Sequence, residues 1–321
     1  MKDFAPIMKL VIQIPCLNEE ATLPIVLKSL PAKIKGIDEI IVIVMDDGST
    51  DRTVEVARAH GVTEIVPHAR NVGLARMFHD GVNRALELGA DIVVNTDADN
   101  QYPQERIGDL VQPILRGEAD IVIGDRQTQT IEHFSAGKKL LQRIGSRVVN
   151  KAAGTDLPDA ASGFRAYSRE SLLQLNIITR FSYCMETIIQ AGVKRMAISS
   201  IPITTNPKLR ESRLFKSTRE HVFKSASAII RAYLMYHPYM VFGTLGYSLL
   251  VLGLVPFARY LYLTYIGDTG RGHLQSLILG SVLLTGAFLC LVLNIIADLI
   301  RINRILIEAN LEQTKRLRYS K

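Results

Sequence analysis

Three clusters of polar residues follow directly on short apolar runs that are typical of buried strands. The sharpest is DADNQ, residues 97–101, which follows DIVVNT. Asp97 and Asp99 are one residue apart, so both carboxylates can turn towards a hard divalent cation, and Gln101 can add a carbonyl oxygen. We predict a site for Mg²⁺ or Mn²⁺ here, with a nucleotide diphosphate filling the remaining positions. A solvated acidic turn is the alternative, because isolated motifs of this kind are common.

The second cluster is DDGSTD, residues 46–51, at the end of the run EIIVIVM. Gly48 can turn the chain there, while Asp46 or Asp47 accepts hydrogen bonds from a nucleobase or ribose. Ser49 or Thr50 could instead cap the helix that follows. The two interpretations are compatible, because capping leaves both aspartates free to face a ligand.

Strand-like runs alternate with segments of helical periodicity over about the first two hundred residues, as expected for α/β domains. The runs are residues 9–15, 39–47, 63–69, 91–99, 120–126 and 194–207. This alternation predicts a mainly parallel sheet with helices on both faces. Ligands bind at the carboxyl ends of such strands, and the polar clusters, including CLNEE at 16–20, stand at those ends.

Two long apolar runs, Tyr239 to Ile266 and Leu274 to Ile300, dominate the last third of the chain. Each exceeds the ~20 residues that cross a bilayer, so we predict a hairpin of two transmembrane helices. A buried core hairpin is the alternative, but core helices are seldom apolar on every face over this length. Small residues could also join copies of the chain into a homo-oligomer within the membrane, namely Gly243, Gly246, Gly280 and Gly286.

The net charge of +7 is concentrated beside these apolar runs. Residues 207–231 hold seven Lys/Arg against two Glu, and residues 301–321 hold six against two. The positive-inside rule therefore places residues 1–213, the α/β domain, and the basic tail 301–321 in the cytoplasm. We expect an integral protein of the plasma (inner) membrane, with anionic lipid rather than nucleic acid as the partner of these charges.

Residues 214–238 predict an amphipathic helix, since one face is apolar and the other is basic. Such a helix can lie in the interface between lipid and water. Packing against the catalytic domain would produce the same stripe, so both interpretations stay open.

Six segments resemble the family-2 glycosyltransferases in order and spacing. They are IPCLNEE, DDGSTD, RNVGLARMFHDGVNRA, DADNQYP, DIVIGDR and ASGFRAYSRES. The chain is similar, over about residues 9–215, to the polyprenol-phosphate sugar synthases, a group that contains dolichyl-phosphate mannose synthase and bacterial polyprenyl-phosphate glucosyltransferases. Six ordered motifs are much more specific than any one of them. The resemblance implies a GT-A-type, Rossmann-like nucleotide-sugar-binding domain.

The resemblance also implies roles for single residues. It places the base and ribose of the nucleotide at Pro15, Asn18, Glu19 and Asp47, and the metal at Asp97, Asp99 and Gln101. Arg126 would lie near the diphosphate and sugar, and Asp159 near the acceptor. Arg210 and Arg213 would hold the acceptor phosphate, although the family pattern there is closer to a Ser-Lys pair.

The implied reaction is an inverting transfer of a hexose to polyprenyl phosphate at the cytoplasmic membrane face. We favour UDP-glucose as the donor over GDP-mannose, and nothing in the residues separates uracil from guanine. Asp159 could be a base, could orient a cation that holds the phosphate, or could only form an Asx turn. A processive polysaccharide synthase is disfavoured because its Gln-x-x-Arg-Trp motif needs tryptophan, which the sequence lacks. A non-enzymatic nucleotide-sugar sensor is disfavoured because both metal carboxylates are present.

Overall fold

The computed structural model describes residues 7–128, 136–177, 183–207, 227, 230, 233–234, 238–266 and 274–320. The chain divides into two compact units. One unit contains Met1–Ile230 and Leu311–Lys321, and the other contains Arg231–Asn310. Arg210, Arg213 and most of the expected amphipathic helix at 214–238 lie outside the described residues.

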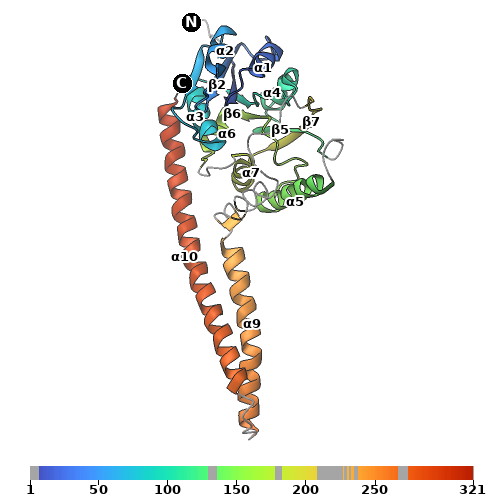
Figure 1. The fold of residues 1–321 in the computed structure, drawn as a ribbon. Coiled ribbons are helices and arrows are strands. Elements are labelled where there is room, and N and C mark those ends of the chain that lie inside the picture. The colour runs from blue at the N-terminus through green and yellow to red at the C-terminus, as the bar shows by residue number, and fades with distance from the viewer. Residues whose placement is uncertain are drawn as a thin grey trace. The chain divides into compact units, whose positions relative to one another are not determined.

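The first unit is built on a seven-stranded sheet of order β3-β2-β1-β4-β6-β5-β7 (Figure 1). The strands are β1 Lys9–Cys16, β2 Glu39–Asp46, β3 Glu64–Pro67, β4 Ile92–Asn95, β5 Ile121–Asp125, β6 Arg165–Ser168 and β7 Ile198–Pro202. All pairings are parallel except those of β6 with β4 and β5. The mainly parallel sheet is therefore confirmed, and the antiparallel β6 is an addition that strand periodicity did not reveal.

Helices cover both faces of this sheet, as expected. They are α1 Leu23–Ser29, α2 Thr53–Ala59, α3 Leu74–Glu87, α4 Ile107–Leu115, α5 Ala136–Ala153, α6 Arg169–Gln174 and α7 Tyr183–Val193, with a 3-10 turn at Gln104–Arg106. Side chains alternate along β1: Leu10, Ile12 and Ile14 belong to the core with α1, α2 and α4. Gln13 points to the other face, where α3 approaches so closely that a Cβ on Gly81 would lie 2.4 Å from Gln13 Oε1.

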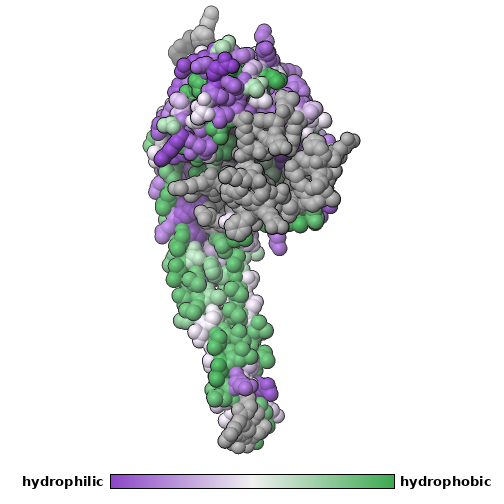
Figure 2. Space-filling model, in the orientation of Figure 1, coloured by the Kyte–Doolittle hydropathy of each residue, from purple (hydrophilic) through white to green (hydrophobic). Residues whose placement is uncertain are grey.

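The second unit consists of α9, Pro238–Tyr265, and the first part of α10, Leu274–Arg318. Both helices are long and apolar enough to cross a membrane, and only 17% of the most apolar window of each is buried. Apolar residues cover their visible surface (Figure 2), and Val255 and Phe288 are each 66% exposed. Such a surface is unlike a core hairpin and suits lipid.

Glycines bring α9 and α10 together within one chain. A Cβ on Gly246 would lie 3.0 Å from Leu291, and one on Gly280 would lie 3.1 Å from the backbone nitrogen of Phe257. Gly243 faces Asn294 at 3.7 Å. A Cβ on Gly286 would likewise lie 3.6 Å from Leu249. All four glycines that could join copies of the chain thus face the partner helix of the hairpin itself, as small residues do in membrane helix pairs.

The basic tail that we expected from residue 301 is helical, because α10 continues to Arg318. Its last residues belong to the first unit and contact α6. Lys315 Nζ donates to Leu175 O at 2.6 Å, Arg316 binds Glu170, and Arg318 lies 2.9 Å from Glu87. Part of the charge that we assigned to lipid headgroups is therefore engaged with protein carboxylates and carbonyls.

Candidate active site

The polar clusters meet at one edge of the sheet. Strand β1 is paired in register with β2, so that Cys16 lies opposite Asp46, and with β4, so that Gln13 lies opposite Asn95. The order of the parallel strands changes direction between β1 and β4, which is where ligands bind in open α/β sheets. Because β6 is antiparallel, its first residue, Arg165, also lies at this edge, opposite Asn95.

The carboxylate loop after β4 is held by its own side chains. Gln101 donates to Asp99 through its backbone N–H, at 3.0 Å, and through Nε2, at 2.6 Å. A side-chain amide can bind a cation only through its oxygen, and the bond from Nε2 to Asp99 leaves Oε1 of Gln101 for that role. Asn100 has a φ of 59°, a left-handed conformation that asparagine tolerates better than most residues.

Asn206, from the segment after β7, fixes the same loop from outside. Its backbone N–H donates to Gln101 O at 2.9 Å, and its Nδ2 donates to Asn100 O and Tyr102 O at 3.1 and 3.3 Å. One side chain and its backbone thus bind three consecutive carbonyls. Sequence pattern does not indicate this role, because residue 206 is 105 positions beyond residue 101 and only the sheet order brings them together.

The DDGSTD turn has the shape expected of it, but its helix cap differs. Gly48 has a φ of 76°, and a Cβ there would lie 3.0 Å from the backbone of Arg70, so glycine is required. Helix α2 begins at Thr53, and the expectation that Ser49 or Thr50 caps it is wrong. Instead Asp51 Oδ1 accepts from the N–H of Thr53 at 3.0 Å.

The two adjacent aspartates of this turn are engaged with backbone. Asp47 Oδ1 accepts from Val72 N at 2.6 Å, and the N–H of Gly73 also points at this carboxylate, which ties the turn to the start of α3. Burial raises the pKa of Asp47, although these amide donors oppose that shift. Asp46 Oδ1 accepts from Ser49 N at 3.2 Å.

The CLNEE segment after β1 is joined to the DDGSTD turn. Asn18, with a φ of 56°, accepts from Thr50 N at 2.7 Å through Oδ1 and donates its own N–H to Ser49 Oγ at 2.9 Å. Glu19 is buried, and its Oε2 accepts from Thr22 Oγ1 at 2.6 Å. These bonds hold the CLNEE segment and the DDGSTD turn together at the carboxyl ends of β1 and β2. Pro15, opposite Met45 in the sheet, lies at the same edge.

Asp159, which is buried, and Arg126, which is partly exposed, form an ion pair. Arg126 Nε and Nη2 donate to the two carboxylate oxygens at 2.6 and 2.9 Å, and Asp159 Oδ1 also accepts from Ala161 N at 3.3 Å. Burial alone would raise the pKa of Asp159, but the guanidinium outweighs it and holds the pKa below its usual value. Asp159 is therefore an ionised, fixed group that both pairs with a cation and makes a turn-type bond.

A buried polar network supports this site, and sequence reasoning missed it. Asn95 Nδ2 donates to Gly163 O and Tyr183 Oη at 3.0 and 2.6 Å, and Gly163 N donates to Tyr102 Oη at 2.9 Å. A Cβ on Gly163 would lie 3.6 Å from Asp97 Oδ2, so this glycine joins the carboxylate loop to the Asp159 segment. The signal available in the sequence was a polar Asn95 within an otherwise apolar strand.

Arg165 binds the carbonyls of the residues that follow Asp159. It is fully buried, and its donors go to Ser162 O, Ala160 O, Cys184 O and Thr187 Oγ1 at 2.6 to 2.9 Å. Five guanidinium donors in a rigid fork suit this set of carbonyls, which lysine could not satisfy.

The donor set after β4 fits a divalent metal of the kind that we expect. Within the described part of the chain, no group of three His, Cys, Asp or Glu residues is placed to hold an ion by itself. Two carboxylates, Asp97 and Asp99, at an open strand end suit an ion that takes its other ligands from a bound diphosphate, as Mg²⁺ does. Asp97, Asp99 and Gln101 remain predicted ligands.

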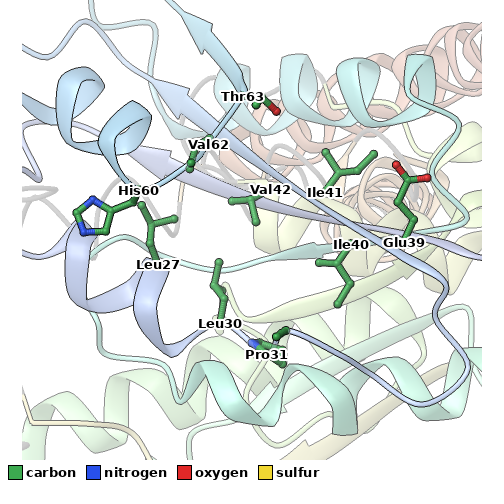
Figure 3. Close-up of a pocket in the computed structure, with 12 residues that line it drawn as sticks. Leu27, Leu30, Pro31, Glu39, Ile40, Ile41, Val42, His60, Val62 and Thr63 are labelled. Atoms are coloured by element: carbon green, nitrogen blue, oxygen red, sulfur yellow. The ribbon is translucent and has the colours of Figure 1, made fainter.

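A separate cavity, of about 470 Å³, lies away from these residues (Figure 3). It is lined by Leu27 and Leu30 of α1, by residues 39–42 at the start of β2, and by residues 60–63 before β3. It therefore lies at the amino ends of the strands, opposite the edge that carries the carboxylates.

Comparison with known proteins decides the family. The sequence profile described as Glycosyl transferase family 2 matches residues 11–175, which is about half of the chain. The chain belongs to glycosyl transferase family 2. The matched range of the family contains the CLNEE, DDGSTD and DADNQ clusters and the Asp159–Arg126 pair, whereas Asn206 lies beyond it.

Three curated relatives in this family are similar to the chain. The low-salt glycan biosynthesis hexosyltransferase Agl6 of Haloferax volcanii is 28% identical over 79% of this chain, which spans only 59% of that relative. A UDP-N-acetylglucosamine–dolichyl-phosphate N-acetylglucosaminyltransferase of Methanococcus voltae is 28% identical, over 60% of this chain and 83% of the relative. The polyprenol monophosphomannose synthase of Mycolicibacterium smegmatis is 26% identical, over 70% and 89%.

A solved structure shares the fold of this family-2 member. Glucosyl-3-phosphoglycerate synthase from Mycobacterium tuberculosis, in complex with Mn²⁺, UDP-glucose and phosphoglyceric acid, aligns with a TM-score of 0.55 and 25% identity. The alignment covers 71% of this chain and 79% of that one. The GT-A-like α/β fold is thereby confirmed.

Proposed function

We propose that this glycosyltransferase moves a hexose from a nucleotide sugar to polyprenyl phosphate with inversion at the anomeric carbon. The observation that carries the proposal is the meeting of Asp97 and the Asp159–Arg126 pair through Gly163 and Tyr102 at one sheet edge. A metal ion at Asp97 would bind a nucleotide diphosphate. The guanidinium of Arg126, held in place by Asp159, could bind a second phosphate. The names of the relatives supply the acceptor class, dolichyl or polyprenol phosphate.

The bond changes are simple in this reaction. An oxygen of the acceptor phosphate forms a bond to the anomeric carbon, and the bond from that carbon to the nucleoside diphosphate breaks. A phosphate monoester has its second pKa near ~6, so its oxygens are already anionic at neutral pH and need placement more than deprotonation. The resemblance places Arg126 near the diphosphate and sugar, but its pairing with Asp159, the residue expected near the acceptor, leads us to propose that it orients those oxygens. A divalent ion on Asp97 and Asp99 would offset charge on the departing diphosphate.

We propose UDP-glucose as the donor, with GDP-mannose as the second candidate. A UDP-linked donor is supported by the Methanococcus voltae relative and by the UDP-glucose complex of the solved structure. The second candidate is supported by the name of the Mycolicibacterium smegmatis relative. Asp47, Pro15, Asn18 and Glu19 would surround the base and ribose in either case.

We also propose that α9 and α10 anchor the protein in the plasma (inner) membrane, with the catalytic unit in the cytoplasm. The apolar surface of both helices and the basic residues next to the apolar runs support this topology. A cysteine introduced within residues 267–273, between the two apolar runs, should react with an impermeant thiol reagent added outside intact cells, whereas one introduced at Lys33 should not.

Radiolabelled transfer tests the activity. The full chain, in nanodiscs with polyprenyl phosphate, is given UDP-glucose, UDP-N-acetylglucosamine or GDP-mannose, and lipid-linked label is measured. Transfer from one of these donors, lost in EDTA and in Asp99→Asn, is the expected result, because the substitution removes a charge from the ion. No lipid-linked product from any donor, or full activity in EDTA, would overturn the proposal.

A further inference from the structure

His68 lies between the DDGSTD turn and α3. It directly follows β3, and its backbone N–H donates to Asp46 O at 2.9 Å. Its ring Nδ1 lies 3.1 Å from the same carbonyl oxygen, and its ring Nε2 lies 3.1 Å from Asp80 Oδ2 on α3. The imidazole ring therefore joins the end of β2 to α3.

Both partners of the ring are hydrogen-bond acceptors. A backbone carbonyl oxygen can only accept, and so can an ionised carboxylate. Burial alone would raise the pKa of Asp80, but hydrogen bonds from three neighbouring side chains outweigh burial and hold this pKa below its usual value, so Asp80 is ionised at neutral pH. A neutral imidazole has one N–H and can serve only one of the two acceptors, whereas an imidazolium serves both. The geometry therefore fits a protonated His68.

Charged and titratable groups face this ring from α3 and from the turn after β2. On α3, Asp80 contacts the ring directly and also lies 2.8 Å from Arg76 Nε and 3.0 Å from His79 Nδ1. In the turn, burial raises the pKa of Asp47, and the charge of His68 is one of the effects that oppose this shift. Carboxylates thus lie on both sides of the ring and favour its charged form.

The segment between β3 and α3 is tied at both ends to adjacent residues of the turn. At its start, the backbone and ring of His68 bind Asp46 O. At its end, Val72 N donates to Asp47 Oδ1 at 2.6 Å, and the N–H of Gly73 points at the same carboxylate. The ring therefore helps to fix the turn that carries the carboxylates of Asp46 and Asp47.

We propose that His68, as an imidazolium, is a positioning residue of the donor site, and that the site loses affinity for the nucleotide when the ring loses its proton. A histidine changes charge between about pH 5 and about pH 8. After the proton has left, one ring nitrogen faces an acceptor without a hydrogen to donate, so the bond to Asp46 O or the bond to Asp80 is lost. This inference rests on the proposed function, because it assumes that a nucleotide binds at the turn.

Nucleotide affinity measured against pH tests the inference. The dissociation constants of UDP and of GDP, each with Mg²⁺, are measured by calorimetry for the full chain in nanodiscs. His68→Gln cannot become charged, so it should bind about fivefold more weakly than the parent at about pH 6, which is the effect of one lost hydrogen bond, and as well as the parent at about pH 8.5. The ratio of variant to parent removes the titration of the nucleotide itself.

Two further variants separate the charge from a general loss of structure. His68→Arg has donors for both acceptors at every pH, so its affinity should stay close to that of the parent at about pH 6 across the whole range. His60→Gln is the matched control, because the His60 ring also lies close to a carbonyl, Val56 O at 2.9 Å, but at the end of α2 beside the separate cavity. It should leave the pH dependence of binding unchanged.

Steady-state transfer distinguishes positioning of the donor from a part in the chemistry. At about pH 6, His68→Gln should raise the KM for the nucleotide sugar about fivefold and leave kcat within about twofold, because the ring contacts no reacting atom. A loss confined to kcat would overturn the proposal. So would a ratio of variant to parent affinity that is the same at both ends of the pH range.

The charge of the ring can be measured without any nucleotide. Nitrogen-15 NMR of the full chain, labelled in histidine, should show at about pH 7 one imidazole with both nitrogens protonated, and His68→Gln should remove this signal. Asp80→Asn should convert it to a neutral ring at the same pH, because the amide gives the imidazolium no negative partner. A neutral His68 in the parent would overturn the proposal. No nucleotide binding at any pH would overturn the proposed function and this role with it, whereas binding that His68→Gln leaves unchanged would overturn this role alone.

Discussion

Asp159 is ionised and fixed by Arg126, and this limits the role that it can take. Its lowered pKa makes it a weak base, so we expect it to position the cation and the acceptor phosphate. Asp159→Asn should lower kcat about 100-fold with little change in nucleotide affinity, because misplacement of a reacting group costs that much. The defect should persist from about pH 6 to about pH 8, as the acceptor becomes a dianion. Recovery of the mutant rate at the higher pH would identify Asp159 as a base instead.

The same pair also contributes to stability, with a defined pH dependence. The folded-state pKa of Asp159 lies below its unfolded value of ~3.9, so the contribution is complete above that value and is lost as the pH falls through the lower one. Asp159→Asn leaves the partly buried Arg126 charge without its partner, which should lower the free energy of unfolding by about 2–3 kcal/mol at pH 7. An unchanged unfolding midpoint in urea would contradict the ion pair.

Asn206 has its own test at the residue scale. Asn206→Ala keeps the bond to Gln101 O, which uses backbone, but removes those to Asn100 O and Tyr102 O. Because the carboxylate loop is then held less firmly, the metal concentration for half-maximal activity should rise several-fold. The free energy of unfolding should fall by only ~1–3 kcal/mol. Asn176→Ala, which also removes a side-chain bond to a carbonyl, at Gln174, is the control. An equal change in metal requirement for both variants would show a general loss of stability.

At the scale of elements, the end of α10 stabilises α6 through two different contacts. Lys315 donates to the carbonyl of Leu172 in α6 and to that of Leu175, the residue directly after α6, whereas Arg316 and Glu170 form an exposed pair. Lys315→Met should lower the free energy of unfolding by about 1 kcal/mol. Arg316→Glu should lower the free energy of unfolding by less than ~1 kcal/mol. Adding Glu170→Arg should restore the original free energy of unfolding. These changes are measured by thermal unfolding, and a destabilised charge-swapped double variant would contradict the pairing.

At the scale of the whole molecule, we expect the two candidate membrane-spanning helices and the sheet to have separable roles. A chain ended at residue 237 keeps every strand and the whole candidate site. It should bind nucleotide in calorimetry and lose efficient transfer to long-chain acceptors in vesicles, because it no longer has the proposed anchor. It also loses Leu311–Lys321, so it should unfold at a lower temperature than the full chain. Full activity on long-chain lipid would show that the α9–α10 hairpin is dispensable.

The sequence alone determined the features that depend on local pattern. Short apolar runs that end in CLNEE, DDGSTD and DADNQ identify strands and the polar residues at their carboxyl ends, because period-2 burial and turn chemistry act over a few residues. The length of the two apolar runs near the C-terminus likewise identifies them as candidate membrane-spanning helices. The ordered motifs then indicated the glycosyltransferase family, which the comparison confirmed.

Only the tertiary structure decided which distant residues meet. Antiparallel β6 brings Asp159 to Arg126, 33 positions away, and β7 brings Asn206 to the carboxylate loop. The pattern within α5 does not by itself say which of its faces packs on α7 and which is left exposed. The reason is physical: local periodicity fixes which face of an element is apolar, whereas the partner of a buried charge or carbonyl depends on strand order, direction and register, which are set by packing over the entire domain.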